Sequence, residues 1–221
     1  MGKGKVLPAI KKSLKDWQFE YFDLYLIHWP FCFKTDEVTG STVYDSNNVA
    51  VVDTQFSLED TWREMEALVE AGLAKSIGVS NFSVDILKRI LAIPGLKVKP
   101  AVDQVELHPY LPQTELRQFC ETEGIVCEAY SSLGSGKAPS LLEDPTVLKV
   151  ASALNIPAGS VLLSWARQKG IPVIPKSGTR SRVVENFNHH TIPENLMAEL
   201  DAIAKRHRYV DPLNFWGHPM P

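Results

Sequence analysis

Between residues 74 and 130 the sequence alternates short apolar segments with amphipathic ones at nearly even spacing. The strand-like segments are 76–79, 101–105 and 125–129, and the helix-like segments between them are 84–93 and 113–124. Strands that alternate with helices build βαβ units, in which the strands are parallel and the crossovers are right-handed. The even spacing favours a barrel-like repeat over two separate domains. We therefore expect an α/β fold.

Further segments extend this pattern on both sides. Apolar stretches at 24–27 and 171–174 predict two more strands, and the sequence predicts a single domain over residues 1–221 because no linker divides it. The polar segment 31–55 is too long for a plain connection, and such loops tend to be functional or disordered. The tail 207–221 is aromatic and rich in proline, without a period that predicts a helix or strand.

Composition excludes several classes of protein. The formal net charge of −3 argues against a general nucleic-acid binder. No apolar run of 18 residues predicts a membrane span, and residues 1–10 lack the apolar region of a signal peptide. Cys32, Cys120 and Cys127 have no CxxC spacing, so we interpret them as reduced packing residues of a cytosolic protein rather than zinc ligands.

Polar side chains that can bind or react follow every predicted strand. They are His28; Ser80 and Asn81; Gln104, Glu106 and His108; Tyr130, Ser131 and Ser135; and Lys176, Ser177 and Thr179. In a (β/α) barrel the carboxyl ends of the strands carry the active site. Each residue also has a structural interpretation: a hydrogen-bonded histidine, a helix cap or a core aromatic. The five sets together favour a functional site.

The segment 175–186 predicts an anion site. Lys176, Arg180 and Arg182 surround hydroxyl side chains at the start of a predicted helix. Helix starts and guanidinium groups both bind phosphate, so a phosphate monoester suits this segment. An ordinary basic helix start is the alternative. No metal site is predicted, because His189 and His190 lack helical spacing and a third ligand.

Five motifs together resemble the aldo-keto reductases, in the same order and across nearly the whole chain. They are "DLYLIHWP", "GVSNF", "QVELHPYL", "AYSSLGSG" and "IPKSGTRSRVVEN". The resemblance implies a (β/α)8 TIM-type barrel that binds NADP(H) across the rim without a Rossmann motif. It also implies an enzyme that reduces small-molecule aldehydes or ketones by hydride transfer. The composition already predicts a cytoplasmic protein with no nucleic-acid or membrane partner. The segment 31–55 has a weak similarity to members that act on small sugars and polyols.

The resemblance also assigns roles to individual residues. His28 matches the catalytic histidine that hydrogen-bonds the substrate carbonyl. The residues that match cofactor contacts are Ser80, Asn81 and Gln104 at the carboxamide; Tyr130 on the nicotinamide ring; Ser131, Leu133 and Ser135 at the pyrophosphate; Lys176, Ser177 and Arg182 at the 2′-phosphate; and Glu185 and Asn186 at the adenine. Those that match the substrate pocket are Trp29, Phe215 and Trp216.

One departure from the family pattern affects the function. The family's acid/base tyrosine, with its lysine and aspartate, has no counterpart in this sequence, which begins at the helix before the fourth strand of the family pattern. We expect a truncated barrel that lacks three strands, self-associates through its unpaired edges and is impaired in catalysis. Tyr44 is a disfavoured substitute acid. The alternatives are a catalytically silent NADPH-binding or interaction protein and, less favoured, a partner resembling potassium-channel β-subunits.

Overall fold

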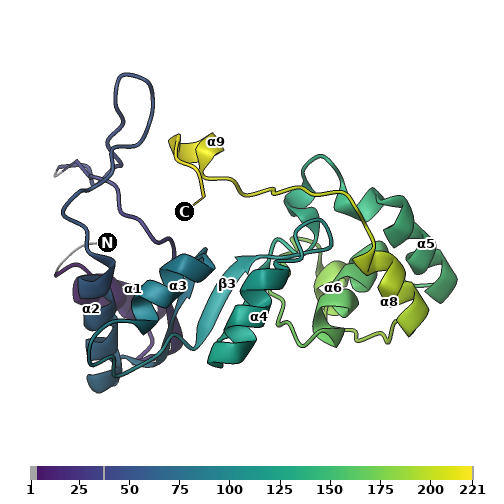
Figure 1. The fold of residues 1–221 in the computed structure, drawn as a ribbon, viewed down its shortest axis with the longest axis horizontal. Helices are drawn as coiled ribbons and strands as arrows, with labels where there is room; N and C mark the ends of the chain where they lie inside the picture. Colours follow the sequence, from purple (N-terminus) through teal and green to yellow (C-terminus); the bar gives the residue numbers. More distant parts are fainter. Residues whose placement is uncertain (1–3, 37, 221) are drawn as a thin grey trace. The chain divides into compact units, whose positions relative to one another are not determined.

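A computed structural model describes residues 4–36 and 38–220 (Figure 1). The chain forms two compact units. Unit 1 comprises the described residues of 1–103, 122–125 and 211–221, and unit 2 comprises 104–121 and 126–210. The strand order in the sheet is β1-β2-β3-β4. The prediction of one domain over 1–221 stays a prediction.

Unit 1 is built on the parallel pair β1 and β2. Strand β1 (Phe22–Ile27) pairs with β2 (Ala74–Ser80), and Ala101 N donates to Ile77 O where β3 (Val102–Glu106) begins. A Cβ on Gly78 would lie 2.5 Å from Val102 O, so only glycine lets the strands approach this closely. His28 directly follows the end of β1, and Asn81 directly follows the end of β2.

The helices of unit 1 bury one apolar face each. They are α1 (Val6–Trp17), α2 (Leu58–Glu70) and α3 (Val84–Leu91). Helix α1 buries Val6, Ile10 and Leu14, which lie on one face at helical spacing. Helix α2 begins where Ser57 Oγ accepts a hydrogen bond from Asp60 N at 3.1 Å, which satisfies one of the free N–H groups of its first turn.

Unit 2 packs helices around β4 and the end of β3. Its elements are β4 (Val126–Tyr130), most of α4 (Thr114–Glu123), α5 (Pro145–Leu154), α6 (Ala158–Gln168), α7 (Arg180–Glu185), α8 (Glu194–Asp201) and two short 3-10 helices, Gly134–Gly136 and Leu141–Glu143. Trp165 lies in the core, where its Nε1 donates to Asp201 Oδ1 at 2.7 Å and joins α6 to the end of α8. Asp144 caps α5 by accepting from Thr146 N at 2.8 Å.

Two expectations about the backbone need correction. The fifth predicted strand, 171–174, is only a parallel bridge between Val173 and Ala129, because Pro172 and Pro175 lack the N–H that a longer ladder requires. The tail, which has no periodic pattern, nevertheless forms the short helix α9 (Leu213–Trp216).

No single helix within the described ranges is long and apolar enough to cross a membrane, and α5 and α6 meet that standard only when the two helices, bent by 93°, are counted together.

Candidate functional site

His28 and Asn81 lie at the ends of neighbouring strands in unit 1. Asn81 Nδ2 donates to His28 O at 2.9 Å and to Ser80 Oγ at 3.1 Å. Asn81 and Ser80 are buried, whereas the His28 residue is exposed. Asn81 also adopts φ of +66°, a conformation that Asn tolerates better than most residues. The sequence-predicted pair Ser80–Asn81 therefore holds the backbone from which His28 projects.

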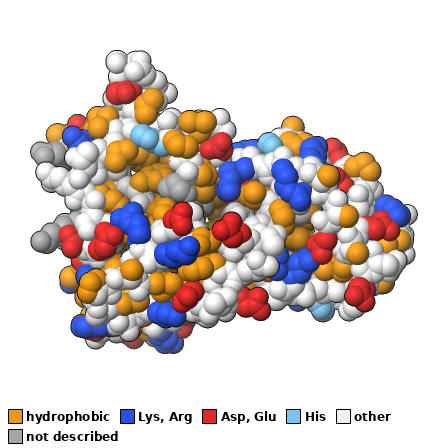
Figure 2. All heavy atoms as spheres, viewed as in Figure 1, with side chains coloured by type: hydrophobic (Ala, Val, Ile, Leu, Met, Phe, Trp, Pro, Cys, Tyr) orange, Lys and Arg blue, Asp and Glu red, His pale blue; other side chains and the backbone are white. Residues whose placement is uncertain are grey.

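Trp29 packs in an aromatic cluster that joins the loop 31–55 to the tail. Trp216 contacts Trp29, Phe31 and Phe33, with ring centroids 5.3, 5.7 and 5.1 Å apart. On the face in Figure 2, hydrophobic side chains gather over unit 1. The structure thus brings Trp29 and Trp216 together, and Phe215 adjoins Trp216 with half of its surface exposed. Their role in a substrate pocket stays a prediction. Sequence reasoning missed Phe31 and Phe33, although two aromatics directly after the Trp29-Pro30 pair were a visible signal.

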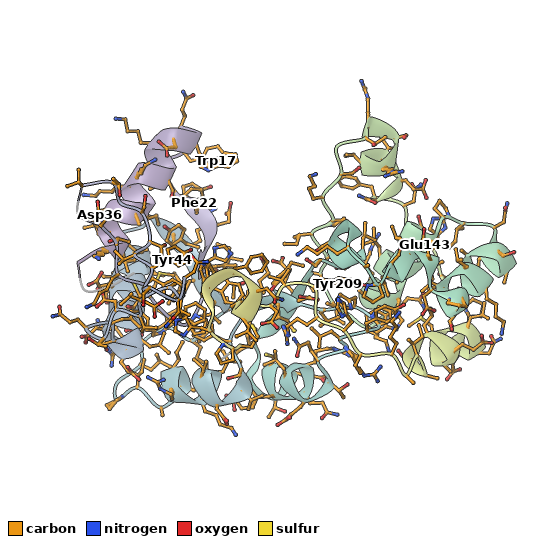
Figure 3. All side chains as sticks on the ribbon, turned by 90° about the horizontal axis from the view of Figure 1, so that it is seen from above. Trp17, Phe22, Asp36, Tyr44, Glu143 and Tyr209 are labelled. Carbon is orange, nitrogen blue, oxygen red and sulfur yellow. The ribbon has the colours of Figure 1, made fainter. Side chains whose placement is uncertain are left out.

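The described residues of the loop, 31–36 and 38–55, form an irregular antiparallel ribbon. Its bridges pair Phe33 with Val52, Thr35 with Thr42 and Tyr44 with Ala50. Asp36 and Tyr44 mark this ribbon in Figure 3. The backbone N–H of Ala50 donates to Trp216 O at 2.9 Å, and His218 Nε2 donates to Ala50 O at 2.7 Å. The ribbon therefore presents its backbone to the tail, and Tyr44, the disfavoured substitute acid, is 42% exposed.

The fold of the ribbon depends on two turn-forming aspartates. Asp36 accepts from Thr39 N at 2.7 Å and from Val38 N at 3.1 Å, and these bonds, with that of the Thr39 hydroxyl, lower the pKa of the Asp36 carboxyl. Asp45 accepts in the same way from Asn47 N and Val49 N. Such side-chain turns explain how a polar segment without strand periodicity stays ordered.

In unit 2, Gln104 within β3, and Ser131 and Ser135 after β4, are the predicted cofactor residues nearest these strands. Gln104 Nε2 donates to Glu128 Oε2 at 2.6 Å, which fixes the side-chain amide of Gln104 beside β4. Ser131 and Ser135 follow Tyr130, and both adopt positive φ, at +51° and +54°. Ser135 Oγ donates to Ser131 Oγ at 2.7 Å. Non-glycine residues with positive φ cluster at active and binding sites, so this loop is a candidate for one, and its contact with the pyrophosphate stays a prediction.

The cationic segment 175–186 lies on the surface of unit 2. Lys176 and Arg182 are exposed, as is Arg180, and none of the three forms an ion pair with a carboxylate of the described chain. The Ser177 hydroxyl accepts from Thr179 N at 3.1 Å. These cations keep their charge available for an anion.

Glu185 is held in place at the end of α7, next to Asn186. Ser160 Oγ donates to Glu185 Oε1 and Asn188 Nδ2 donates to Oε2, both at 2.9 Å. The hydrogen bond from Ser160 is the main reason that the pKa of Glu185 is lowered, and His190 adds to the effect. Glu185 is therefore a fixed anionic acceptor close in sequence to the cations.

Glu106 and His108, predicted as rim residues, form a buried structural pair instead. His108 Nε2 lies 2.8 Å from Glu106 Oε1, and both side chains are inaccessible to solvent. Glu106 also accepts from Tyr209 N at 2.7 Å and Val210 N at 2.8 Å. Burial alone would raise the pKa of Glu106, but these hydrogen bonds outweigh burial and lower it. Glu106 thus fixes the backbone that leads into the tail.

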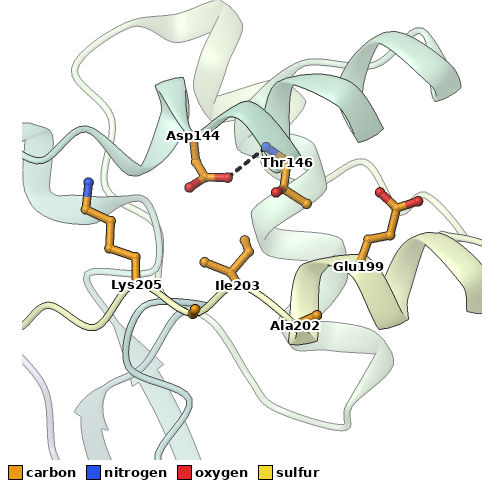
Figure 4. Close-up of a pocket in the computed structure, with 7 residues that line it drawn as sticks. Asp144, Thr146, Glu199, Ala202, Ile203 and Lys205 are labelled. Carbon is orange, nitrogen blue, oxygen red and sulfur yellow. Dashed lines mark hydrogen bonds between the residues drawn. The ribbon is translucent and has the colours of Figure 1, made fainter.

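A pocket of about 430 Å³ opens elsewhere in unit 2, between α5 and α8 (Figure 4). It is lined by Asp144, Thr146, Glu199, Ala202, Ile203, Ala204 and Lys205. None of these residues belongs to the predicted site, and Asp144 already caps α5 and accepts from Tyr110 Oη at 2.8 Å. Across the described residues no three His, Cys, Asp or Glu side chains gather as metal ligands would.

Comparisons with known proteins show which family and which solved structures the chain is similar to. Residues 1–205 match the model of the aldo/keto reductase family. The chain is 42% identical to aldose reductase B of Dictyostelium discoideum over 215 residues, which cover 95% of this chain and 68% of that protein. It is 38% identical to an NAD(P)H-dependent D-xylose reductase of Pyricularia oryzae, covering 96% and 70% of the two chains. The solved aldose reductase of Giardia lamblia superimposes with a TM-score of 0.91 at 37% identity, covering 97% of this chain and 73% of that one.

Proposed function

Since this chain belongs to the aldo/keto reductase family and shares its TIM-barrel fold, we propose that it reduces aldehydes or ketones to alcohols with NADPH. Its relatives include proteins named as reductases, so the chain is an oxidoreductase. The preference for NADPH over NADH, the substrate class and the roles of single residues are parts of the proposal.

The single observation that carries the choice of cofactor is the exposed cationic segment at 176–182. Lys176 and Arg182 lack carboxylate partners in the described chain, and a 2′-phosphate offers several acceptor oxygens to an ammonium and a guanidinium group. Asn81 and Gln104 carry amides suited to the nicotinamide carboxamide, and the Ser131–Ser135 loop suits the pyrophosphate. NADPH supplies the hydride when bound.

His28 is the residue that we propose meets the substrate. Its exposed imidazole can donate a hydrogen bond to a carbonyl oxygen, which orients the carbonyl and stabilises the negative charge that develops there. Trp29 and Trp216 supply an apolar wall in the same unit. Small sugar and polyol aldehydes are the proposed substrates, a choice supported by the D-xylose reductase among the relatives.

We expect the 221-residue chain alone to turn over slowly. General acid catalysis contributes about 10²–10⁴-fold to such reactions, and the family's tyrosine has no counterpart among these residues. The second candidate function is therefore NADPH binding or protein interaction without catalysis. This second candidate also rests on the lack of a counterpart of that tyrosine among these residues.

The test is the reduction of nitrobenzaldehyde with NADPH by the purified 221-residue chain, followed as loss of cofactor absorbance, with NADPH binding measured in parallel. Turnover that His28→Gln lowers at least tenfold would support the reductase function. Binding without turnover would favour the silent alternative. A chain that neither binds NADPH nor reduces the aldehyde would contradict both.

We also propose that the chain is cytoplasmic and associates with itself through the edge at β1. Four aromatic rings follow one another along this part of unit 1, from Trp17 through Phe19 and Phe22 to Tyr25, with centroids 6.1, 6.0 and 5.8 Å apart. Trp17 is 66% exposed and Phe19 54%, and Figure 3 marks Trp17 and Phe22. An apolar strand edge favours pairing with another chain.

Sedimentation over a range of concentrations tests the association. We expect oligomers that dissociate on dilution, and we expect Phe19→Glu to shift them toward monomer. Lys11→Glu, on an exposed position of α1, is the matched control. A chain that stays monomeric at every concentration would contradict this proposal and leave the reductase proposal intact.

A further inference from the structure

Tyr209, which Figure 3 labels, is buried in unit 2 and forms hydrogen bonds through its N–H, its carbonyl oxygen and its hydroxyl. The N–H donates to Glu106 Oε1 at 2.7 Å, and the carbonyl oxygen accepts from Lys137 Nζ at 3.1 Å. The hydroxyl donates to Pro139 O at 2.5 Å. Tyr209 therefore joins the end of β3 to the segment 137–139, which lies far from Tyr209 in sequence.

The ring of Tyr209 also packs against the backbone of Gly134. A Cβ on Gly134 would lie 3.2 Å from both Cζ and Oη of Tyr209, so the two residues are in close contact. The N–H of Gly134 donates to Ser131 O at 2.9 Å, and its carbonyl oxygen accepts from Lys137 N at 3.1 Å. Because Gly134 directly precedes Ser135, the contact with Tyr209 reaches the middle of the loop that we propose binds the pyrophosphate.

This loop depends on support from its buried side. Ser131 and Ser135 have positive φ, which costs free energy and persists only where the surrounding structure holds the backbone. Residues 135–138 are exposed, whereas Tyr209 is 4% exposed and contacts the loop from the interior. Burial, with the negative charges of Glu106 and Asp144, raises the pKa of Tyr209 to about 12. The Tyr209 hydroxyl is therefore protonated at neutral pH and remains a donor.

We propose that Tyr209 is a positioning residue for the cofactor, because its contacts with Gly134 and Pro139 hold the loop 131–137 in the conformation that binds the pyrophosphate of NADPH. This inference rests on the proposed function. Tyr209 acts through the loop and not by touching the cofactor. A loop that is already ordered pays no ordering cost on binding, whereas a loosened loop pays it when the ligand binds. The loss of affinity should therefore affect ligands that carry the pyrophosphate.

Tyr209→Phe in the full 221-residue chain tests this directly. The substitution removes the donor to Pro139 O and keeps the aromatic ring beside Gly134. We expect the affinity for NADPH, measured by fluorescence titration, to fall about fivefold, which is the size of one lost neutral hydrogen bond. Adenosine 2′-monophosphate has the proposed 2′-phosphate and adenine contacts but no pyrophosphate. We expect its affinity, measured by calorimetry, to stay unchanged.

Tyr110→Phe is the matched control. Tyr110 is also buried in unit 2, and its hydroxyl donates to Asp144 Oδ2, at the cap of α5, at 2.8 Å. Both variants lose one buried hydroxyl, so we expect urea titration to show a similar loss of stability in each. Only Tyr209→Phe should weaken NADPH binding. Hydrogen exchange at the amides of Gly134 and Lys137 should become faster in Tyr209→Phe and stay unchanged in Tyr110→Phe.

Three results would overturn the inference. They are a native affinity for NADPH in Tyr209→Phe, an equal loss of that affinity in Tyr110→Phe, and an equal loss of affinity for adenosine 2′-monophosphate in Tyr209→Phe. The last two would indicate a general loss of structure in unit 2 rather than a loosened loop. A native chain that does not bind NADPH would instead contradict the proposed function, and this inference with it.

Discussion

The side chain of Asn81 holds the backbone of His28, through the 2.9 Å hydrogen bond from Nδ2 to the His28 carbonyl oxygen. This bond crosses from the end of β2 to the end of β1, so it connects the residue expected at the cofactor with the residue expected at the substrate. The buried amide of Asn81 has a structural task as well as its proposed cofactor contact.

Asn81→Asp is the sharpest test of that structural task. Asp tolerates the same positive φ, but its carboxylate would face the His28 carbonyl oxygen with an acceptor where a donor is needed. We expect the free energy of unfolding to fall by about 1–3 kcal/mol, measured by urea titration. Asn155→Asp is the matched control, because Asn155 also has positive φ but is exposed. Equal losses in both variants would show that the bond to His28 contributes nothing.

Trp216→Ala is expected to detach the tail from the loop 31–55. It removes ring contacts to Trp29, Phe31 and Phe33, each of a kind that contributes about 0.5–1.5 kcal/mol. Hydrogen exchange at the amides of Ala50 and Gly217 should become at least tenfold faster, while the amides of β2 keep their protection. Leu213→Ala, an exposed position on α9, should change neither. Unchanged exchange at Ala50 in Trp216→Ala would contradict the docking described above.

Glu106 should make the stability of the chain depend on pH. Its folded-state pKa is lowered from the ordinary 4.5, so its contribution is fully present above that value and is lost as the pH falls through the lowered folded pKa. At neutral pH we expect Glu106→Gln to lower the free energy of unfolding by about 1–3 kcal/mol. This difference from the native chain should shrink in acid.

Urea titrations at neutral and acidic pH measure that difference. Glu115→Gln, an exposed carboxylate in the first turn of α4, is the control and should cost little at either pH. If Glu106→Gln lowers the free energy of unfolding by the same amount at both pH values, the charge of the Glu106 carboxylate does not contribute to holding Tyr209 and Val210.

Much of the fold followed from local patterns in the sequence. Apolar residues at helical spacing account for α1, and with the capping serine Ser57 for α2, because helical spacing and side-chain caps are properties of neighbouring residues. The prediction of a strand at 171–174 was wrong. Its apolar residues fit the pattern of a strand, but its prolines lack the N–H groups that would extend a ladder. Helix α9 was missed because its four residues are held by contacts with a loop more than 150 residues earlier in the sequence.

The candidate site was only partly predictable for the same reason. His28, Asn81 and Lys176 could be selected because each follows a strand-like segment. Glu106 shares that position but is buried, and its partners Tyr209 and Val210 are about a hundred residues away. Strand alternation shows where a polar residue stands along the chain. It does not show whether tertiary contacts cover it.

Fluorescence titration of the chain with NADPH and with NADH compares the two affinities, and so tests the proposal that Lys176 and Arg182 bind the 2′-phosphate of NADPH. The account predicts tighter binding of NADPH, and a loss of that preference of at least tenfold in Lys176→Ala and in Arg182→Ala, because each removes a cation from the proposed 2′-phosphate site. Lys11→Ala, an exposed lysine on α1, should keep the preference. Equal affinity for the two cofactors in the native chain, or an unchanged preference in both variants, would contradict the account.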